Sequence, residues 1–149
     1  MRVALGFDHR GFLIKDELVA FLKEEGHEVV DCGTNSTESV DYPDTAADVG
    51  KAVLSGDAER GIVVCGSGAG AAIAANKLRG IRCAIAHDTY TAHQCVEHDD
   101  ANVLALGSAV VGIELARELV RTFLGARFQS GVERYERRLR KVQRLEDGT

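Results

Sequence analysis

The sequence predicts an α/β protein in which a parallel sheet of five strands lies between two layers of helices. Two observations support this class. Short apolar runs alternate with helical segments along the whole chain, and a Gly-rich turn follows the central apolar run. This alternation is typical of a three-layer, doubly wound, Rossmann-like sheet. With 149 residues, 45% of them hydrophobic, residues 1–149 are expected to form a single domain with a buried core.

Five segments have the apolar, β-branched composition of strands in a parallel sheet. They are residues 3–7, 27–31, 62–64, 82–86 and 102–106. Segments of helical composition or amphipathic period follow these strands. They are residues 12–25, 44–54, 71–77, 89–97, 113–124 and 131–146. Gly26 and Gly125 come directly after two of these helices, where glycine commonly ends a helix.

Polar segments follow the first three strands and mark one edge of the expected sheet. Asp8-His9-Arg10-Gly11 follows the first strand, the polar loop 32–44 follows the second, and the Gly-rich turn follows the third. A loop as long as 32–44 in a compact domain is typically functional. Because ligands of such folds bind at the carboxyl ends of the strands, we expect the site at this edge.

The Gly-rich turn places a thiol beside a potential anion-binding loop. Cys65 ends the third strand, Gly66-Ser67-Gly68-Ala69-Gly70 follows, and a helix begins after it. Glycines let the backbone approach a ligand closely, and the first N–H groups of a helix lack partners. A base or nucleophile next to such donors favours an enzyme. The alternative is a tightly packed turn with an inert buried cysteine.

The same turn also matches a dinucleotide-binding pattern. Gly66-Ser67-Gly68-Ala69-Gly70-Ala71 fits G-x-G-x-x-A, and Asp88 follows about 20 residues later, as an acidic residue does in that fingerprint. A nucleotide-binding module is therefore an open alternative.

Composition narrows the class of partner. The net charge of −5 argues against a general nucleic-acid surface, and no apolar run is long enough for a membrane span or a secretory leader. The expected location is the cytoplasm. The four cysteines form no C-x-x-C pair, so we expect reduced thiols and neither zinc nor disulfides.

The last helix, residues 131–146, differs from the others because its apolar side chains form a narrow seam. The seam consists of Val132, Tyr135, Leu139 and Val142. We expect it to dock on a neighbouring subunit. Arg134 and Arg138 are four residues apart and share a face, which suits a phosphate, although a basic face on a helix is also often simply solvated.

Two of the five histidines are candidate site residues. His9 follows Asp8 at a strand end, and His98 precedes two aspartates at a helix end. His98 is either an exposed helix-end residue or an acid catalyst, because a histidine can serve either role near neutral pH. His93 and His98 are five residues apart, which places them on different faces of a helix, so no metal site is predicted.

Several motifs occur together in a fixed order along residues 3–142. They are Gly6-x-Asp8-His9-x-Gly11, Asp41-Tyr42-Pro43, Cys65-Gly66-Ser67-Gly68-x-Gly70, Ile73-Ala74-Ala75-Asn76-Lys77, Gly80-Ile81-Arg82, His98-x-Asp100-x-Asn102-Val103-Leu104 and Arg134-x-x-Arg137-Arg138. In this ordered set the chain resembles the type B ribose-5-phosphate isomerase family, which also contains isomerases of allose and galactose 6-phosphates.

The resemblance implies an aldose–ketose isomerisation that needs neither metal nor cofactor. In this family Cys65 would be the base that moves a proton between C1 and C2 of the sugar through an enediolate, and Ser67 would tune its thiolate. The backbone N–H groups that would hold the enediolate oxygen are those around Gly66, Gly68, Ala69 and Gly70.

The resemblance also assigns the remaining contacts to the sugar phosphate. His98 would be the acid that opens the furanose ring, Asp8 would bind sugar hydroxyls and Tyr42 would line the pocket. The phosphate would be held by His9, Arg134 and Arg138. The site would lie between two subunits of a homodimer or a dimer of dimers. The expected substrate is ribose 5-phosphate, with tetrose or hexose phosphates as the alternative.

Four features bear on the placement of this chain within the family. Ala71 stands where the branch that lacks the cysteine has a glutamate, so the chain groups with the cysteine users. Asp99 replaces the usual Asn after His98, where it would touch sugar hydroxyls, and Tyr135 replaces a frequent His. Residues 130–133 lengthen the spacing before the arginines. These differences concern the length and hydroxyl pattern of the sugar.

Overall fold

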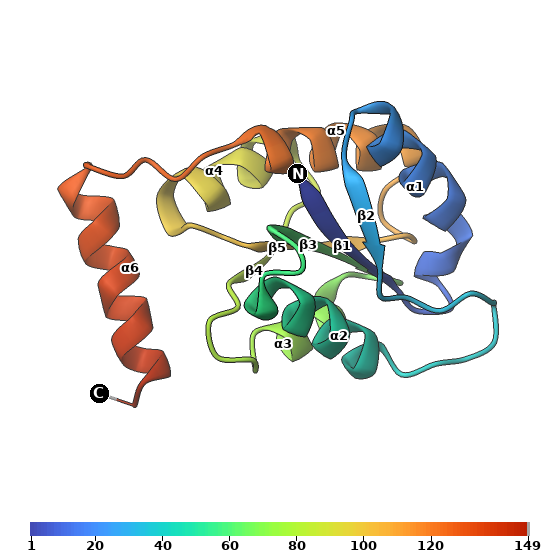
Figure 1. The fold of residues 1–149 in the computed structure, drawn as a ribbon, viewed down its shortest axis with the longest axis horizontal. Coiled ribbons are helices and arrows are strands. Elements are labelled where there is room, and N and C mark those ends of the chain that lie inside the picture. The colour runs from blue at the N-terminus through green and yellow to red at the C-terminus, as the bar shows by residue number, and fades with distance from the viewer. Residues whose placement is uncertain (149) are drawn as a thin grey trace.

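Five parallel strands form the central sheet of the computed structural model, which describes residues 1–148 (Figure 1). They are β1 (Arg2–Phe7), β2 (Glu28–Asp31), β3 (Arg60–Cys65), β4 (Cys83–Ile85) and β5 (Val103–Gly107). Their order across the sheet is β2-β1-β3-β5-β4, so β3 is central and β2 and β4 are the edges. The predicted parallel five-stranded sheet is confirmed.

Helices cover both faces of this sheet (Figure 1). They are η1 (Gly11–Ile14), α1 (Lys15–Glu24), α2 (Tyr42–Ser55), α3 (Ala69–Ala75), α4 (Thr89–Asp99), α5 (Ile113–Gly125) and α6 (Glu133–Glu146). Figure 1 shows α1, α4 and α5 on one face and α2 and α3 on the other. The predicted three-layer arrangement is therefore confirmed.

Alternate residues of each central strand pack into different cores. Leu5 and Phe7 of β1 face α1, α4 and α5 in a core of large aliphatic and aromatic side chains. Ala4 and Val63 face α2 and α3 in a core that is mostly alanine and valine. Because the side chains of the second core are small, α2 and α3 lie close to the sheet, and their first turns come near the strand ends.

The boundaries of three predicted helices differ from the structure for local reasons. α2 begins at Tyr42 rather than 44, because Pro43 fits the first turn, where a missing N–H is no loss. α3 begins at Ala69 rather than 71, after Gly68 in a left-handed conformation with φ of 81°. The helix predicted from residue 12 opens with the 3₁₀ turn of η1.

The helix α6 stands apart from the three layers at one side of the molecule (Figure 1). Its far end is tied to the turn before β4, where Arg79 pairs with Asp147 and the Gly80 N–H donates to Glu146 at 2.7 Å. Within α6, Tyr135 is the buried residue. Docking of α6 on a second subunit stays a prediction. None of the helices in residues 1–148 combines the length and the apolar composition that a membrane crossing requires.

The close approach of α2 to β1 yields a testable prediction. A Cβ at Gly6 would lie 2.6 Å from Val49 Cγ2 and 2.7 Å from Thr45 Cγ2, both on α2. Gly6→Ala is therefore expected to lower the free energy of unfolding by about 1–3 kcal/mol, as overpacking typically does. Urea unfolding at fixed protein concentration measures this change.

Gly125→Ala is the matched control, because a Cβ at this position meets nothing within 4 Å. Equal unfolding free energies for Gly6→Ala and the unmodified protein would contradict the packing described here.

Candidate active site

Asp8 is held rigidly at the carboxyl end of β1. Its Oδ1 accepts hydrogen bonds from the N–H groups of Arg10 at 2.9 Å and Gly11 at 2.8 Å. Gly11 packs against the end of β3 so closely that a Cβ would overlap the carbonyl oxygen of Val64. Oδ2 of Asp8 accepts no hydrogen bond within residues 1–148, so this oxygen is left for a ligand. The role of Asp8 in binding sugar hydroxyls stays a prediction.

Cys65 ends β3 with a nearly buried thiol, 5% exposed, and its Sγ accepts a hydrogen bond from the Gly68 N–H at 3.1 Å. A donor of this kind stabilises negative charge on the sulfur. Ser67 lies beside it, but its Oγ accepts from the Ala69 N–H at 3.2 Å rather than contacting the sulfur. The thiol thus has one backbone donor from the turn, the Gly68 N–H.

The first turn of α3 leaves N–H groups free for an anion. The Ala72 N–H is the first to bond within the helix, to the Gly68 carbonyl at 3.0 Å. The N–H groups of Gly70 and Ala71 therefore have no intrahelical partner. Of the predicted N–H donors, those of Gly68 and Ala69 are already used, by Cys65 Sγ and Ser67 Oγ. The donors left for an anion are therefore those of Gly70 and Ala71.

Two side chains lie directly on the glycines of the turn. A Cβ at Gly70 would lie 2.7 Å from the Tyr42 ring, so this ring covers the start of α3. A Cβ at Gly66 would lie 2.6 Å from Nη1 of Arg10. Sequence reasoning missed Arg10, although its place two residues after Asp8 put it at the correct edge.

His9 connects the long polar loop to the site. Its Nδ1 accepts the Val40 N–H at 3.2 Å, so in the neutral ring the proton is on Nε2. At the other end of the loop, the buried Lys15 ammonium binds Asp31 Oδ2 at 2.7 Å, the Thr34 carbonyl at 3.0 Å and Asn35 Oδ1 at 2.8 Å. Lys15 was also missed, because helical periodicity gave no sign that its charged end turns toward the loop.

His87 is a third residue at this edge that sequence reasoning did not single out. Its Nε2 accepts the Gly107 N–H at 3.0 Å. Gly107 packs against Ser67, since a Cβ there would lie 2.6 Å from the Ser67 carbonyl carbon. His87 thus supports the wall of the Gly-rich turn from the β5 side. Its position directly after the fourth predicted strand was the available signal.

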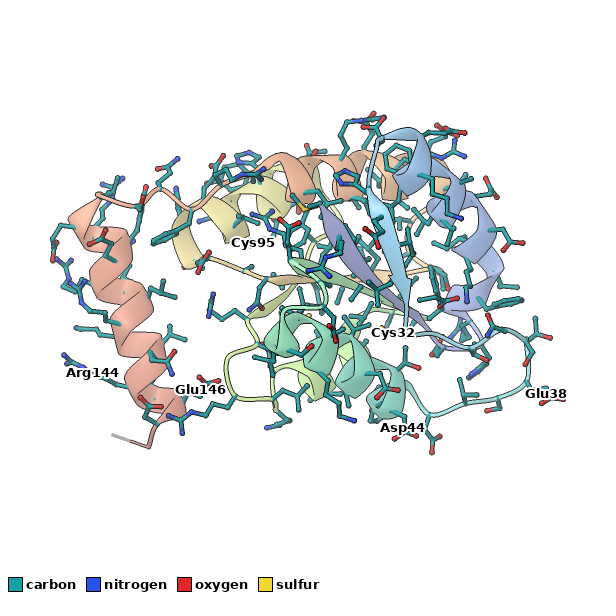
Figure 2. All side chains as sticks on the ribbon, viewed as in Figure 1. Cys32, Glu38, Asp44, Cys95, Arg144 and Glu146 are labelled. Atoms are coloured by element: carbon teal, nitrogen blue, oxygen red, sulfur yellow. The ribbon has the colours of Figure 1, made fainter. Side chains whose placement is uncertain are left out.

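The other three thiols are poorly suited to act as bases. Burial raises the pKa of Cys83 to about 12 and that of Cys95 to about 11. Burial also raises the pKa of Cys32, with a further contribution from nearby aspartates. Figure 2 shows Cys32 just after β2 and Cys95 on α4. Among the described cysteines, Cys65 is the one placed beside the donors of the Gly-rich turn.

Within one chain, His98 lies at the opposite edge of the sheet from Cys65. α4 starts at the carboxyl end of β4 and runs back for 11 residues, which is about 16 Å of helix. Asp100, just beyond it, binds the Arg82 guanidinium through its carbonyl and carboxylate oxygens, both at 2.7 Å. Because Arg82 precedes β4, the end of α4 lies at the amino ends of the strands.

His98 is gathered with the first turn of α6 instead. Its ring stacks on Tyr135 with centroids 4.0 Å apart, and its Nδ1 is 2.9 Å from Gln94 Nε2. Arg134 donates from Nη2 to the Tyr135 hydroxyl at 2.8 Å. Asp99 ends α4 beside His98, and Arg138 lies one turn beyond Arg134 on the exposed side of α6.

The structure therefore divides the predicted site residues into two groups. The carboxyl-edge group consists of Asp8, His9, Tyr42, Cys65, Gly66, Ser67, Gly68, Ala69 and Gly70. The α4–α6 group consists of His98, Asp99, Arg134 and Arg138. Each group is coherent, but one chain does not bring them together.

Asp88 has a structural role in the fold. Asp88, the acidic residue of the dinucleotide pattern, caps α4: its carboxylate accepts the N–H and the hydroxyl of Thr91, both at 2.7 Å, and these bonds lower its pKa. It is therefore already used within the fold. For a metal, residues 1–148 offer no cluster of three or more His, Cys, Asp or Glu side chains.

A nearly buried cysteine next to free helix N–H groups and a fixed carboxylate is the equipment of an enzyme that moves protons on an anionic intermediate. The family model described as Ribose/Galactose Isomerase matches residues 3–142. This match covers most of the chain, so the protein belongs to the ribose/galactose isomerase family. It is an isomerase of phosphorylated sugars.

Individual relatives agree with this assignment over nearly full length. Ribose-5-phosphate isomerase B of Escherichia coli is 46% identical over 145 residues, which cover 97% of this chain and 96% of the relative. The solved structure of Clostridium thermocellum ribose-5-phosphate isomerase B has a TM-score of 0.95 at 49% identity and 99% coverage of both chains. D-erythrulose-4-phosphate isomerase of Pectobacterium atrosepticum is 39% identical, with 88% and 87% covered.

The anchoring of the polar loop by Lys15 predicts a selective effect of substitution. Lys15→Met keeps the apolar stem but removes the charged donor that Asp31, Thr34 and Asn35 share. We expect the unfolding free energy to fall by about 1–3 kcal/mol. Limited proteolysis should then cut first within residues 32–41.

Lys51→Met is the control, because Lys51 is exposed and pairs with the nearby Asp48 on α2. If Lys15→Met left both the unfolding free energy and the proteolytic pattern unchanged, the ammonium would not be what holds the loop.

Proposed function

We propose that this protein interconverts ribose 5-phosphate and ribulose 5-phosphate, with Cys65 as the base. The observation that carries the proposal is the placement of the Cys65 sulfur at the end of β3, 3.1 Å from a backbone donor and beside the free N–H groups of α3. The similarity to ribose-5-phosphate isomerase B over nearly the whole chain supports the choice of substrate.

In the proposed reaction, the Cys65 thiolate removes the proton from C2 of the open-chain aldose. The electron pair of that C–H bond forms the C1=C2 double bond, and the C1 carbonyl oxygen takes the negative charge. The N–H groups of Gly70 and Ala71 stabilise this oxyanion, and a well-placed donor is worth roughly 3 kcal/mol. The thiol then returns the proton to C1, a proton shifts between the two oxygens, and the ketose forms.

The remaining carboxyl-edge residues hold the sugar in place. The free Oδ2 of Asp8 accepts hydrogen bonds from sugar hydroxyls, and the Tyr42 ring closes the pocket above Gly70. His9 donates from Nε2, because its Nδ1 is occupied by the Val40 N–H. It therefore suits a phosphate oxygen as a neutral donor.

A second copy of the chain would bring the two groups together. We infer a homodimer, or a dimer of dimers, in which the α4–α6 group of one subunit completes the carboxyl-edge group of the other. A two-fold axis perpendicular to the strands reverses their direction, so the amino edge of one sheet meets the carboxyl edge of its partner. With such an axis, His98 at the amino edge of one subunit would come close to Cys65 at the carboxyl edge of the other.

The surface around β4 is suited to this contact. β4 is an edge strand, and beside it Ile73 of α3 is 64% exposed and Ile85 is 40% exposed. They line a largely apolar hollow of about 510 Å³. A neighbouring cavity of about 460 Å³ lies between β4 and the α6 seam residues Leu139 and Val142. An exposed strand edge with an apolar surround is a common protein interface.

A tetrose phosphate is the second candidate substrate. The similarity to a D-erythrulose-4-phosphate isomerase favours it. A hexose phosphate would require more space between Cys65 and the arginines. Comparing kcat/KM for erythrose 4-phosphate, ribose 5-phosphate and allose 6-phosphate decides among the three. Thermal stabilisation by NAD or AMP, with none by sugar phosphates, would instead favour a nucleotide-binding module.

Substitution of the base tests the chemistry. Cys65→Ala is expected to lower kcat for ribose 5-phosphate by about 10²- to 10⁴-fold, the usual contribution of a general base. Coupled spectrophotometric assays of ketose formation, with EDTA present, measure the effect. Cys83→Ala is the matched control, since that thiol is protonated at neutral pH. Near-normal turnover by Cys65→Ala would refute the assignment.

Mixing two inactive variants tests the shared site. Cys65→Ala and His98→Ala are each expected to be inactive as homodimers. After refolding together, half of the dimers are mixed, and one of the two sites in each mixed dimer has both residues. We therefore expect about a quarter of the unmodified activity. Activity no higher than that of the separate variants would show that the residues do not meet across subunits.

A further inference from the structure

The half-buried imidazole of His98 lies between the end of α4 and the beginning of α6. Tyr135 is 5% exposed, whereas most of the side chains around it on α6 are exposed. Its ring lies against the imidazole with centroids 4.0 Å apart and planes inclined by 18°, which is a stacked arrangement. The buried residue of α6 thus packs on the His98 ring.

A second contact fixes the rotation of the same imidazole. Gln94, one turn earlier on α4, lies with its Nε2 2.9 Å from Nδ1 of His98. With one ring face on Tyr135 and Nδ1 on Gln94, the other nitrogen is left for chemistry. No hydrogen bond to Nε2 is found within residues 1–148.

Tyr135 also contacts the neighbouring cation of α6. Arg134 donates to its hydroxyl at 2.8 Å, and the guanidinium carbon lies 4.8 Å from the ring centroid. Tyr135 therefore joins two side chains that would act on different parts of one sugar phosphate. Arg134 would hold the phosphate, and His98 would act at the ring oxygen.

We propose that Tyr135 is a positioning residue that holds the His98 imidazole for opening of the sugar ring and sets its distance from the phosphate-binding Arg134. This inference rests on the proposed function, and it assigns a role to a residue that differs from the family's frequent histidine at this position. Gln94 assists by holding Nδ1.

Ring opening explains why this position matters. The C1–O4 bond breaks, O4 takes the proton of His98 Nε2, and C1 becomes a carbonyl as its hydroxyl proton leaves to water, which then reprotonates the imidazole. In ribose 5-phosphate only C4 and C5 separate the ring oxygen from the phosphate ester. Because Arg134 and His98 both contact Tyr135, this residue holds the proton donor at a set distance from the phosphate, next to the ring oxygen.

Substrates with and without a ring separate this role from a general structural one. Ribose 5-phosphate is mostly a furanose, whereas 4-deoxyribose 5-phosphate and erythrose 4-phosphate cannot close one, because the C4 oxygen is absent or carries the phosphate. Tyr135→Leu is expected to lower kcat on ribose 5-phosphate by about 10- to 100-fold, as misplaced catalytic groups do, and to leave kcat on the open-chain aldoses within about twofold.

Two other variants define the mechanism of the effect. Gln94→Leu should give the same selective loss while leaving α6 intact, which keeps the test valid if Tyr135→Leu folds poorly. Tyr135→Phe retains the stacked ring and loses the Arg134 contact, so it should restore kcat and raise KM for the five-carbon phosphates. Tyr90→Leu is the control: Tyr90 also meets a histidine, His93, edge-on at 5.4 Å, but on an exposed part of α4.

The inference is overturned if Tyr135→Leu and Gln94→Leu lower kcat equally for closed and open-chain substrates, or if neither changes it. These outcomes differ from failure of the proposed function, in which the unmodified protein itself does not turn over ribose 5-phosphate.

Discussion

The close contact between the ends of β1 and β3 is the constraint on which the carboxyl-edge site depends. Gly11 can lie on the Val64 carbonyl because it has no Cβ. This contact, together with the two hydrogen bonds that Asp8 accepts from its own turn, places a fixed carboxylate beside the strand that ends in Cys65. The thiol and the carboxylate therefore come from a backbone arrangement with little freedom to move, which suits a site that must hold a small substrate to within a fraction of an ångström.

The remaining wall of the site is more adaptable, and it is tied down by polar contacts rather than by packing. The loop between β2 and α2 contains few apolar residues, so it cannot be held by burial alone. Lys15 holds one end through three acceptors, and His9 holds the other through the Val40 N–H. Tyr42 follows this loop and covers Gly70. The anchored loop thus fixes the position of the Tyr42 ring above the free N–H groups of α3.

The direction of α4 decides the larger organisation. A helix that follows a parallel strand returns to the opposite edge of the sheet, so residues at its end cannot meet residues at the carboxyl ends of strands in the same chain. His98 and Arg134 are consequently grouped around Tyr135, away from Cys65. The exposed apolar residues around the β4 edge supply a surface where a second copy could join the groups. The separation of His98 from Cys65 and the exposed β4 edge both follow from the way the strands and helices are connected.

By itself, the sequence determined the element order, the parallel sheet and the position of Cys65 at the end of the central strand, because these follow from local periodicity, strand-end positions and glycine spacing. The ordered motifs also pointed to the correct family. Only the tertiary structure decided which candidates meet: it put His98 at the far edge, used Asp88 as a helix cap, and brought Arg10, Lys15 and His87 to the site. The physical reason is that local patterns specify secondary structure, whereas contacts between side chains distant in sequence depend on how the helices return across the sheet.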